Sequence, residues 1–218
     1  MRFTVVASGD LADGDERWLD GATVIAADAG ASSLDRLGHT PDRLVGDLDS
    51  IPDELLERLA ASGVAIHRHP ADKEASDTEL ALEAAFAGGA TEIVLLGAIG
   101  GSRLDHELAN VLLLADPAFG DRDARIVHGP TTVRVLHDDG GRLALEGAAG
   151  DLVTLLPVGG DATGVRIDGV RWPLTGATLR MGRSRGLSNE LVAPPGSVSL
   201  ERGTLLVVEH RTQGEPTS

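Results

Sequence analysis

The 218-residue sequence has no cysteine and no tyrosine, and its only aromatic residues are three phenylalanines and two tryptophans. Without cysteine there are no disulfides, thiolate zinc sites or cysteine nucleophiles. The shortage of aromatic rings disfavours a base-stacking platform for single-stranded nucleic acid. Nineteen basic against thirty-four acidic residues give a net charge of −15, which argues against a broad electrostatic grip on nucleic acid or anionic lipid. A phosphate-bearing ligand must therefore be bound locally, by a metal ion or a few well-placed bases.

Long apolar runs are also missing from the sequence. No run approaches the ~20 residues that a membrane helix needs, and the apolar stretch in MRFTVVASGD is too short for a signal peptide. Apolar residues nevertheless make up 42% of the chain, enough for one large domain or two small ones. We expect a soluble, cytoplasmic protein with neither a nucleic-acid partner nor a membrane partner.

The first half of the sequence alternates short apolar runs with helical patterns, which is typical of a parallel α/β sheet. The helix expected at 77–87 has a start signal, because Ser76 and Glu79 form the S-x-x-E pattern of a capping box. The pattern predicts strands at residues 3–7, 23–27, 44–45, 64–67 and 93–96, and helices at 31–37, 53–61, 77–87 and 104–115. The last of these helices carries on one face Leu104, Leu108, Val111 and Leu112.

After about residue 130 the apolar residues alternate with period 2, and Gly and Asp turns separate the alternating stretches. Examples are Val133/Val135, Leu143/Leu145, Val153/Leu155 and Val165/Ile167. This alternation predicts a small antiparallel β domain. The sequence as a whole therefore predicts an α/β plus β fold, with an N-terminal parallel-sheet α/β domain at 1–128 and a C-terminal antiparallel β-sandwich-like domain at 129–218.

Four acidic residues follow predicted strands or begin the next helix, at the edge where open parallel sheets bind ligands: Asp28, Asp47, Asp49 and Asp77. In an extended stretch, Asp47 and Asp49 would point to the same side, with Cα atoms roughly 6.5 to 7 Å apart. Together with Asp77 they suit an oxygen-loving cation such as Mg²⁺. The alternative for Asp47 and Asp49 is a turn and helix cap, and for Asp77 a first-turn acid favoured by the helix dipole.

The segment Gly97–Arg103, GAIGGSR, runs from a predicted strand into a helix. Its glycines would let backbone N–H groups approach an anion, although it matches neither a dinucleotide fingerprint nor a Walker A loop. Arg103 offers a planar cationic fork for phosphate, and Asp105 could orient that fork or bind substrate. A solvated Arg–Asp pair is the alternative. Trp172 is either a packing residue or a wall that stacks on a flat, cationic ring.

At these residues the sequence resembles thiamine pyrophosphokinases of the bacterial type. Four blocks carry the resemblance in order: ADAGASSLDRLGHTPDRLVGDLDSI (27–51), PADKEASDTELAL (70–82), GAIGGSRLDHELANVLLL (97–114) and GVRIDGVRWPLTGATLRMGRSRGLSNEL (164–191). The combination of the four blocks is specific for this family, whereas no single block is. Where the family usually has an acid and then Thr, this chain has Glu74 and Ser76, both conservative, and Ser102 lengthens the loop before Arg103 by one residue.

The resemblance implies roles for individual residues. The implied metal ligands are Asp47, Asp49 and Asp77. The nucleotide phosphates or the reacting centre would be faced by Asp28, Gly100, Gly101, Arg103 and Asp105, with Lys73 adding positive charge. On this basis the catalytic group comprises Asp49, Asp77, Arg103 and Asp105. Thiamine would be held by Trp172, Ser188 and Asn189. The resemblance also implies a homodimer whose active sites lie between subunits.

The implied reaction moves the diphosphoryl group of ATP to the hydroxyethyl oxygen of thiamine, with Mg²⁺ as cofactor, and releases AMP. Alternatives are a diphosphokinase for a related acceptor, or a non-catalytic sensor of thiamine or nucleotide that keeps the same pocket. A phosphatase that uses Asp47 as nucleophile is disfavoured, because such enzymes need a downstream lysine and a late acidic motif. Here the single lysine, Lys73, comes early and the second half of the chain is β.

Overall fold

The computed structural model describes residues 1–117, 123–138 and 141–212. The chain forms two compact units, one comprising Met1–Leu113 with Arg122–Gly129 and the other Leu114–Asp121 with Pro130–Ser218. No helix among the described residues is long and apolar enough to cross a bilayer.

The first unit is built on a parallel sheet in the order β4-β3-β2-β1-β5-β6. Strand β1 pairs with both β2 and β5, so the strand order reverses there, and the carboxyl ends at such a switch point are where open α/β sheets bind ligands. The strands are β1 (Arg2–Val6), β2 (Thr23–Ala27), β3 (Arg43–Gly46), β4 (Ala65–Arg68), β5 (Glu92–Leu96) and β6 (Asp123–His128).

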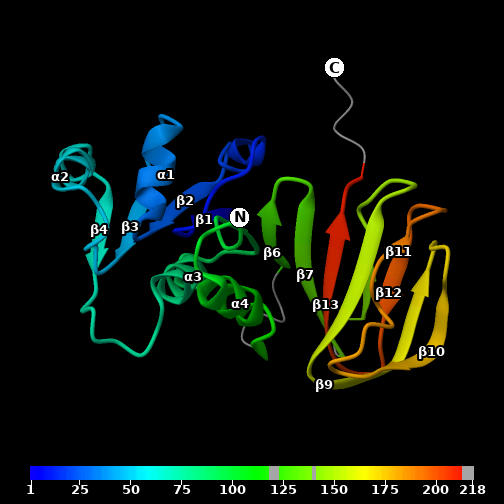
Figure 1. Cartoon of the computed structure of the whole chain (residues 1–218). Coiled ribbons are helices and arrows are strands. Elements are labelled where there is room, and N and C mark those ends of the chain that lie inside the picture. The colour runs from blue at the N-terminus through cyan, green and yellow to red at the C-terminus, as the bar shows by residue number, and fades with distance from the viewer. Residues whose placement is uncertain (118–122, 139–140, 213–218) are drawn as a thin grey trace. The chain divides into compact units, whose positions relative to one another are not determined.

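Helices cover the sheet of the first unit on both faces (Figure 1). Alternate strand residues such as Val24 and Leu44 join a core with Leu34 of α1 and Leu55 of α2. Helix α3 packs against β1, β2 and β3. Their bounds, with a short 3₁₀ turn η1, are η1 (Asp15–Trp18), α1 (Gly30–Arg36), α2 (Asp53–Ala61), α3 (Asp77–Ala87) and α4 (Leu104–Leu113).

Helix α4 turns most of its predicted apolar face to solvent. Leu104, Leu108 and Leu112 are 66%, 55% and 56% exposed in the chain. The buried side chain on this helix is Asn110, whose amide donates a hydrogen bond to the Ala98 carbonyl at 3.0 Å. A polar contact therefore attaches the helix to the segment that follows β5, and the three leucines remain exposed on its surface.

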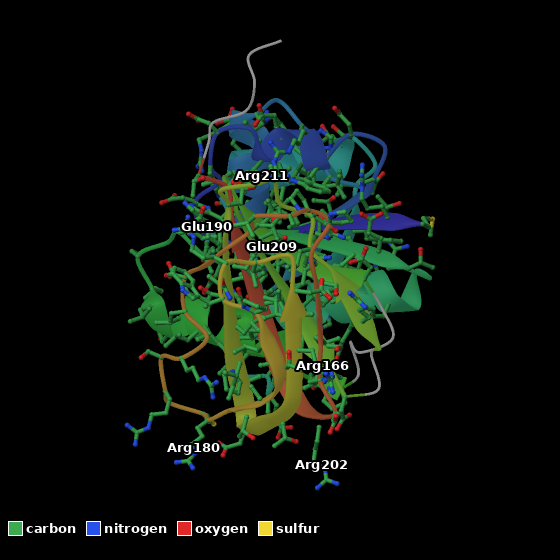
Figure 2. All side chains as sticks on the ribbon, turned by 90° about the vertical axis from the view of Figure 1, so that its right-hand side faces the viewer. Arg166, Arg180, Glu190, Arg202, Glu209 and Arg211 are labelled. Carbon is green, nitrogen blue, oxygen red and sulfur yellow. The ribbon has the colours of Figure 1, made fainter. Side chains whose placement is uncertain are left out.

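The second unit is antiparallel, as predicted, and β9 links its two sheets. The first part of β9 pairs with β13 and β11, and its last part pairs with β10 and β12, so one long strand runs through both sheets. The apolar core includes Val153 and Leu155 from the first part and Val165 and Ile167 from the second. Figure 2 shows Arg180 and Arg202 at one end of this unit and Arg211 at the other. The strands are β7 (Thr131–His137), β8 (Arg142–Ala144), β9 (Leu152–Asp168), β10 (Leu174–Leu179), β11 (Asn189–Glu190), β12 (Ser197–Ser199) and β13 (Arg202–His210).

The start of α3 is fixed by the predicted cap, since Ser76 Oγ accepts a hydrogen bond from the Glu79 N–H at 3.2 Å. Replacing Ser76 with Ala leaves that N–H without its partner, and the free energy of unfolding should fall by about 1 kcal/mol. Urea unfolding followed by circular dichroism measures the loss. Ser76→Asn keeps a capping oxygen and should retain most of the stability. Equal midpoints for Ser76→Ala and the parent would contradict the role of this cap.

Candidate active site

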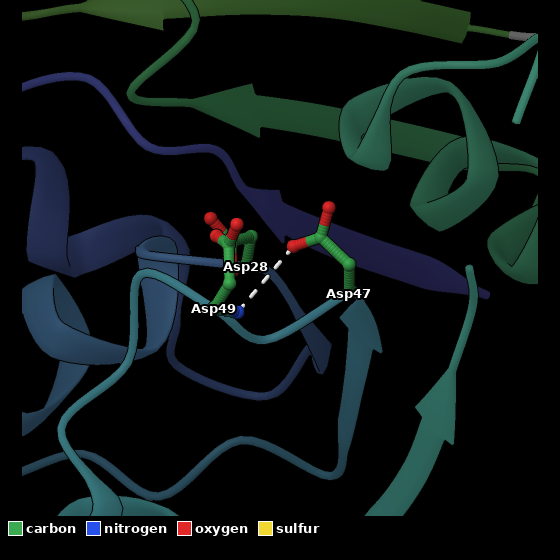
Figure 3. Close-up of side chains that lie close together, drawn as sticks. All are labelled: Asp28, Asp47 and Asp49. Atoms are coloured by element: carbon green, nitrogen blue, oxygen red, sulfur yellow. Dashed lines mark hydrogen bonds between the residues drawn. The ribbon is translucent and has the colours of Figure 1, made fainter. Parts of the chain in front are cut away.

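Three carboxylates meet at the carboxyl edge of the parallel sheet. Asp28 follows β2, and Asp47 and Asp49 follow β3. One oxygen from each side chain lies within 4.8 Å of the others (Figure 3). Neighbouring parallel strands end at the same edge, so two separate stretches of sequence supply one cluster.

The turn that joins Asp47 to Asp49 differs from the extended conformation predicted for it. Leu48 is 4% exposed and has φ 67°, a left-handed conformation that a branched side chain adopts only under constraint from its surroundings. The Asp49 N–H donates to Asp47 Oδ1 at 3.4 Å, and Ser50 Oγ donates to Asp49 Oδ1 at 2.9 Å. The extended prediction was therefore wrong, because burial of Leu48 turns the chain back while both carboxylates stay at the edge.

Gly46, the last residue of β3, lets the neighbouring acids approach the chain. A Cβ atom at this position would lie 3.1 Å from Asp77 Oδ1 and 3.2 Å from Asp28 Cβ. Its φ of 151° is also one that other residues rarely adopt. A side chain at residue 46 would require one of these two aspartates to shift by a few tenths of an ångström.

Lys73 joins the acidic edge to the start of α3. Its Nζ lies 2.6 Å from Asp77 Oδ1 and 3.6 Å from Asp47 Oδ2, and its side chain is only 14% exposed. Burial lowers the pKa of Lys73, but the hydrogen bond to Asp77 and the nearby negative charges outweigh this, so its pKa is raised overall. Lys73 is therefore a cation between Asp47 and Asp77. Asp77 contacts the Lys73 ammonium, whereas the three clustered carboxylates are Asp28, Asp47 and Asp49.

Asp28 carries the clearest sign of a cation-binding role. The residue is 8% exposed, and its Oδ1 is buried without a hydrogen-bond partner. Burial raises the pKa of Asp28, hydrogen bonds from Ser50 and the Ala29 N–H lower it, and the charges of Asp77 and Asp47 raise it further. A buried carboxylate oxygen without a donor, beside two further carboxylates, fits a hard divalent cation such as Mg²⁺.

The glycine loop after β5 already binds an anion, and that anion is a side chain of the protein. Glu107 Oε1 accepts hydrogen bonds from the N–H groups of Gly100 and Gly101 at 3.1 and 2.8 Å. A Cβ on Gly100 would overlap the His128 ring at 2.4 Å, so this glycine is required for the close approach. Sequence reasoning missed Glu107. The available signal was an acid in the first turn of the helix after a glycine-rich segment.

Arg103 and Asp105 form an exposed bidentate pair at the start of α4, with hydrogen bonds of 2.9 and 2.6 Å. The hydrogen bond from Arg103 lowers the pKa of Asp105 far below its usual value. Asp105 is thus a poor proton acceptor at neutral pH, and its clearest effect is to orient the guanidinium. The two side chains are 66% and 64% exposed, so a bound anion can reach Arg103.

A cavity of about 580 Å³ opens within the first unit beside these groups. Residues from the ends of β1, β2, β3 and β5 and from the first turns of α3 and α4 line it, which places it at the switch point of the sheet. The predicted site residues among its walls are Asp28, Asp77, Gly101, Arg103 and Asp105. Asp47, Asp49, Lys73 and Gly100 are not wall residues but contact this group through the ion pairs, carboxylate cluster and loop described above.

The second unit has its own pocket, of about 280 Å³, with Trp172, Arg185 and Asn189 in its walls. The Asn189 side chain accepts a hydrogen bond from the Trp172 N–H at 3.1 Å and donates one to the Trp172 carbonyl at 2.8 Å. Asn189 therefore fixes the backbone that carries the tryptophan. Ser188 is not a wall residue, and its N–H donates to Thr154 Oγ1 at 2.9 Å.

Comparison with known protein families shows to which family this chain belongs. The profile described as "Thiamin pyrophosphokinase, catalytic domain" matches residues 15–127, more than half of the sequence. The chain belongs to the thiamin pyrophosphokinase family. A second profile, "Thiamin pyrophosphokinase, vitamin B1 binding domain", matches residues 142–205.

Individual thiamine pyrophosphokinases are similar in sequence and in fold. The one from Bacillus subtilis is 26% identical over 185 residues, covering 84% of this chain and 85% of that protein. A crystal structure of the enzyme from Geobacillus thermodenitrificans superposes with a TM-score of 0.82 at 29% identity, covering 98% of this chain and 99% of that one. The enzyme from Candida albicans shares the fold at 15% identity, with a TM-score of 0.79 over 96% of this chain and 88% of its own. The predicted family, enzyme class and α/β plus β fold are confirmed.

The acidic cluster predicts how the protein responds to Mg²⁺. In EDTA, Asp49→Asn should be at least as stable as the parent, because the substitution removes like-charge repulsion. Millimolar Mg²⁺ should stabilise the parent, by about 2.7 kcal/mol at a hundredfold excess over the dissociation constant, and should stabilise Asp49→Asn far less. Thermal unfolding with and without Mg²⁺ measures both effects. Asp53→Asn, in the first turn of α2, is the matched control and should respond like the parent. A full Mg²⁺ response in Asp49→Asn would remove Asp49 from the metal site.

Proposed function

We propose that this chain converts ATP and thiamine into AMP and thiamine diphosphate, with Mg²⁺ and ATP bound by the first unit and thiamine by the second. The observation that carries the metal and nucleotide assignment is the buried Asp28 oxygen without a donor, beside Asp47 and Asp49 at the edge of the 580 Å³ cavity. In sequence terms we assign residues 1–128 to the catalytic domain and 129–218 to the thiamine-binding domain.

In the proposed reaction the hydroxyethyl oxygen of thiamine attacks the β-phosphorus of ATP. A bond forms between this oxygen and the β-phosphorus, the bond between the β-phosphorus and the oxygen bridging to AMP breaks, and the hydroxyl proton is lost to solvent. Asp47 and Asp49 of the carboxylate cluster would hold Mg²⁺, and Asp77, which contacts Lys73, is the third ligand that the family resemblance implies; the ion would neutralise charge on the phosphoryl oxygens. Asp28 adds a further carboxylate to this ligand set.

The residues around the cavity would supply positive charge and orient the substrates, and the reaction needs no strong base to deprotonate the alcohol. Lys73 and Arg103 would counter the charge that builds on the diphosphoryl group and on AMP. Asp105 holds the Arg103 fork through two hydrogen bonds. An alcohol held beside a phosphoryl group depends on orientation more than on deprotonation. The low pKa of Asp105 agrees with an orienting role.

The Trp172 pocket suits the flat cationic ring of thiamine. Trp172 is 59% exposed, and the Arg171 guanidinium already lies 5.7 Å from the centre of its ring. This indole therefore attracts a cation in the unliganded chain, as expected for an electron-rich ring face. Asn189 holds the backbone of Trp172 through two hydrogen bonds, and Ser188 precedes Asn189 on the same segment.

We further propose that the protein works as a cytoplasmic homodimer with active sites between subunits. The family resemblance motivates this assembly, and the exposed leucines of α4 offer an apolar surface for a second copy.

The deciding assay incubates the protein with Mg²⁺, ATP and thiamine and separates the products. We expect AMP and thiamine diphosphate in equal amounts. Asp49→Asn should form neither, while Asp53→Asn should form both at the parental rate. ADP with thiamine monophosphate would contradict attack at the β-phosphorus. Thiamine binding without AMP formation would instead favour a sensor, and turnover of a thiamine analogue alone would favour a related acceptor.

Glu107 should compete with the nucleotide, because its carboxylate occupies the N–H groups of Gly100 and Gly101. Glu107→Gln removes a negative charge from the phosphate site and weakens the internal contact. We expect KM for ATP to fall several-fold, with KM for thiamine unchanged. Steady-state kinetics with each substrate varied in turn measures the split. Glu83→Gln on α3, away from the cavity walls, serves as the control. An unchanged or higher KM for ATP in Glu107→Gln would mean that the nucleotide does not use this loop.

A further inference from the structure

The glycine loop after β5 is firmly held at its beginning and exposed at its end. Residues 97–98 are buried, and their carbonyls accept hydrogen bonds from the Gly9 N–H at 2.8 Å and the Asn110 amide at 3.0 Å, respectively. Residues 100–101 are exposed, and their N–H groups donate to the Glu107 carboxylate. A phosphate that bound these N–H groups would replace Glu107, so the exposed end would then depend on its other contacts.

The ring of His128 lies directly against this exposed end. The three atoms nearest to a Cβ built on Gly100 all belong to the imidazole, with Cε1 at 2.4 Å, Nε2 at 2.9 Å and Nδ1 at 3.1 Å. The ring therefore stands where a side chain of residue 100 would project. His128 is the last residue of β6, and β6 pairs in parallel with β5, the strand from which the loop leaves. Because neighbouring parallel strands end at the same edge, the sheet brings this ring to the loop.

A buried carboxylate fixes the backbone beside this ring. Asp15 is fully buried, and it accepts hydrogen bonds from the Gly129 N–H and the Ala12 N–H, both at 2.9 Å. The residue after His128 is thereby held to the segment before η1. The Nδ1 atom of His128 is buried without a hydrogen-bond partner among the described residues. No hydrogen bond through Nδ1 turns the ring toward the loop, so packing against Gly100 is the contact that matters.

We propose that His128 is a positioning residue for nucleotide binding, whose ring supports Gly100 so that the loop N–H groups face the phosphate groups of ATP. This inference rests on the proposed binding of nucleotide phosphates at the glycine loop. A flat ring of similar size should provide the same support, whereas a small side chain leaves a gap behind the loop. A loop that can move into this gap must be ordered again when an anion binds, which lowers its affinity for the anion.

Nitrogen-15 relaxation measurements on the ligand-free protein test the support itself. The backbone order parameters of Gly100 and Gly101 should be about 0.85 in the parent and below about 0.6 in His128→Ala. His128→Phe keeps a flat ring and should retain the parental values. The amides of α3 report on the fold and should be equal in all three proteins. Should His128→Ala fail to fold, His128→Ser repeats the test with a small polar side chain. Unchanged order parameters at residues 100–101 in the small variant would overturn the proposal.

Calorimetric titration with ATP and Mg²⁺ measures the consequence for binding. The dissociation constant for ATP should rise about tenfold in His128→Ala, as expected for the loss of one hydrogen bond to a charged group. The dissociation constant for thiamine should not change. His128→Phe should restore most of the affinity for ATP. The matched control is His137→Ala on β7, which removes a ring whose Nε2 is likewise buried without a partner among the described residues. This control should bind ATP like the parent.

Two results separate this inference from the proposed function. Equal loss of ATP affinity in His128→Phe and His128→Ala would overturn the proposal, because the nucleotide would then depend on an imidazole nitrogen and not on the support of the loop by a ring. Failure of the parent to bind ATP would overturn the proposed nucleotide site. A fall of the order parameters in His128→Ala would even then establish that His128 supports the loop.

Discussion

The crowding of carboxylates at one edge of a parallel sheet is the constraint on which the rest of the site depends. Two like charges 4 Å apart repel by about 4 kcal/mol at an effective dielectric of 20, a sizeable share of the stability of a small domain. One oxygen each of Asp28, Asp47 and Asp49 lies within 4.8 Å of the others, close to that separation, and Asp77 Oδ1 lies beside Gly46 next to Asp28. Lys73, the single lysine of the chain, lies between Asp47 and Asp77 and offsets part of this repulsion.

Charges of the protein occupy several positions where ligand charges are expected. The ammonium of Lys73 lies among carboxylates suited to a metal, the carboxylate of Glu107 accepts the loop N–H groups suited to phosphate, and Arg171 lies over the ring suited to thiamine. A ligand that binds at such a position would replace a charged group of the protein as the partner of the site.

Much of this arrangement could be predicted from the sequence, because it depends on local pattern. The parallel strands follow from short apolar runs, the α3 start from the pairing of Ser76 with Glu79, and the acidic edge from the common direction of parallel strands. The left-handed Leu48 could not be predicted in this way, since burial against a core built from several elements overrides its local preference. The contact from Glu107 to Gly100 depends on how α4 meets the loop, a tertiary relation that spacing alone does not give.

Helix α4 shows how a correct periodicity can still mislead about burial. Leu104, Leu108 and Leu112 recur at helical spacing, and the helix forms as expected, yet the buried position is Asn110. Its amide donates to the Ala98 carbonyl just after β5, and Glu107 on the same helix accepts from the Gly100 and Gly101 N–H groups, so polar contacts attach α4 to the glycine loop. This orientation points the first turn of α4, with Arg103 and Asp105, toward the cavity, and it leaves the leucines on the surface. A helix placed only by its apolar face would bury the leucines and turn the charged first turn away from the ligand. The exposed leucines thus accompany the placement of Arg103 in the cavity wall, and a second subunit that covered them would bury them.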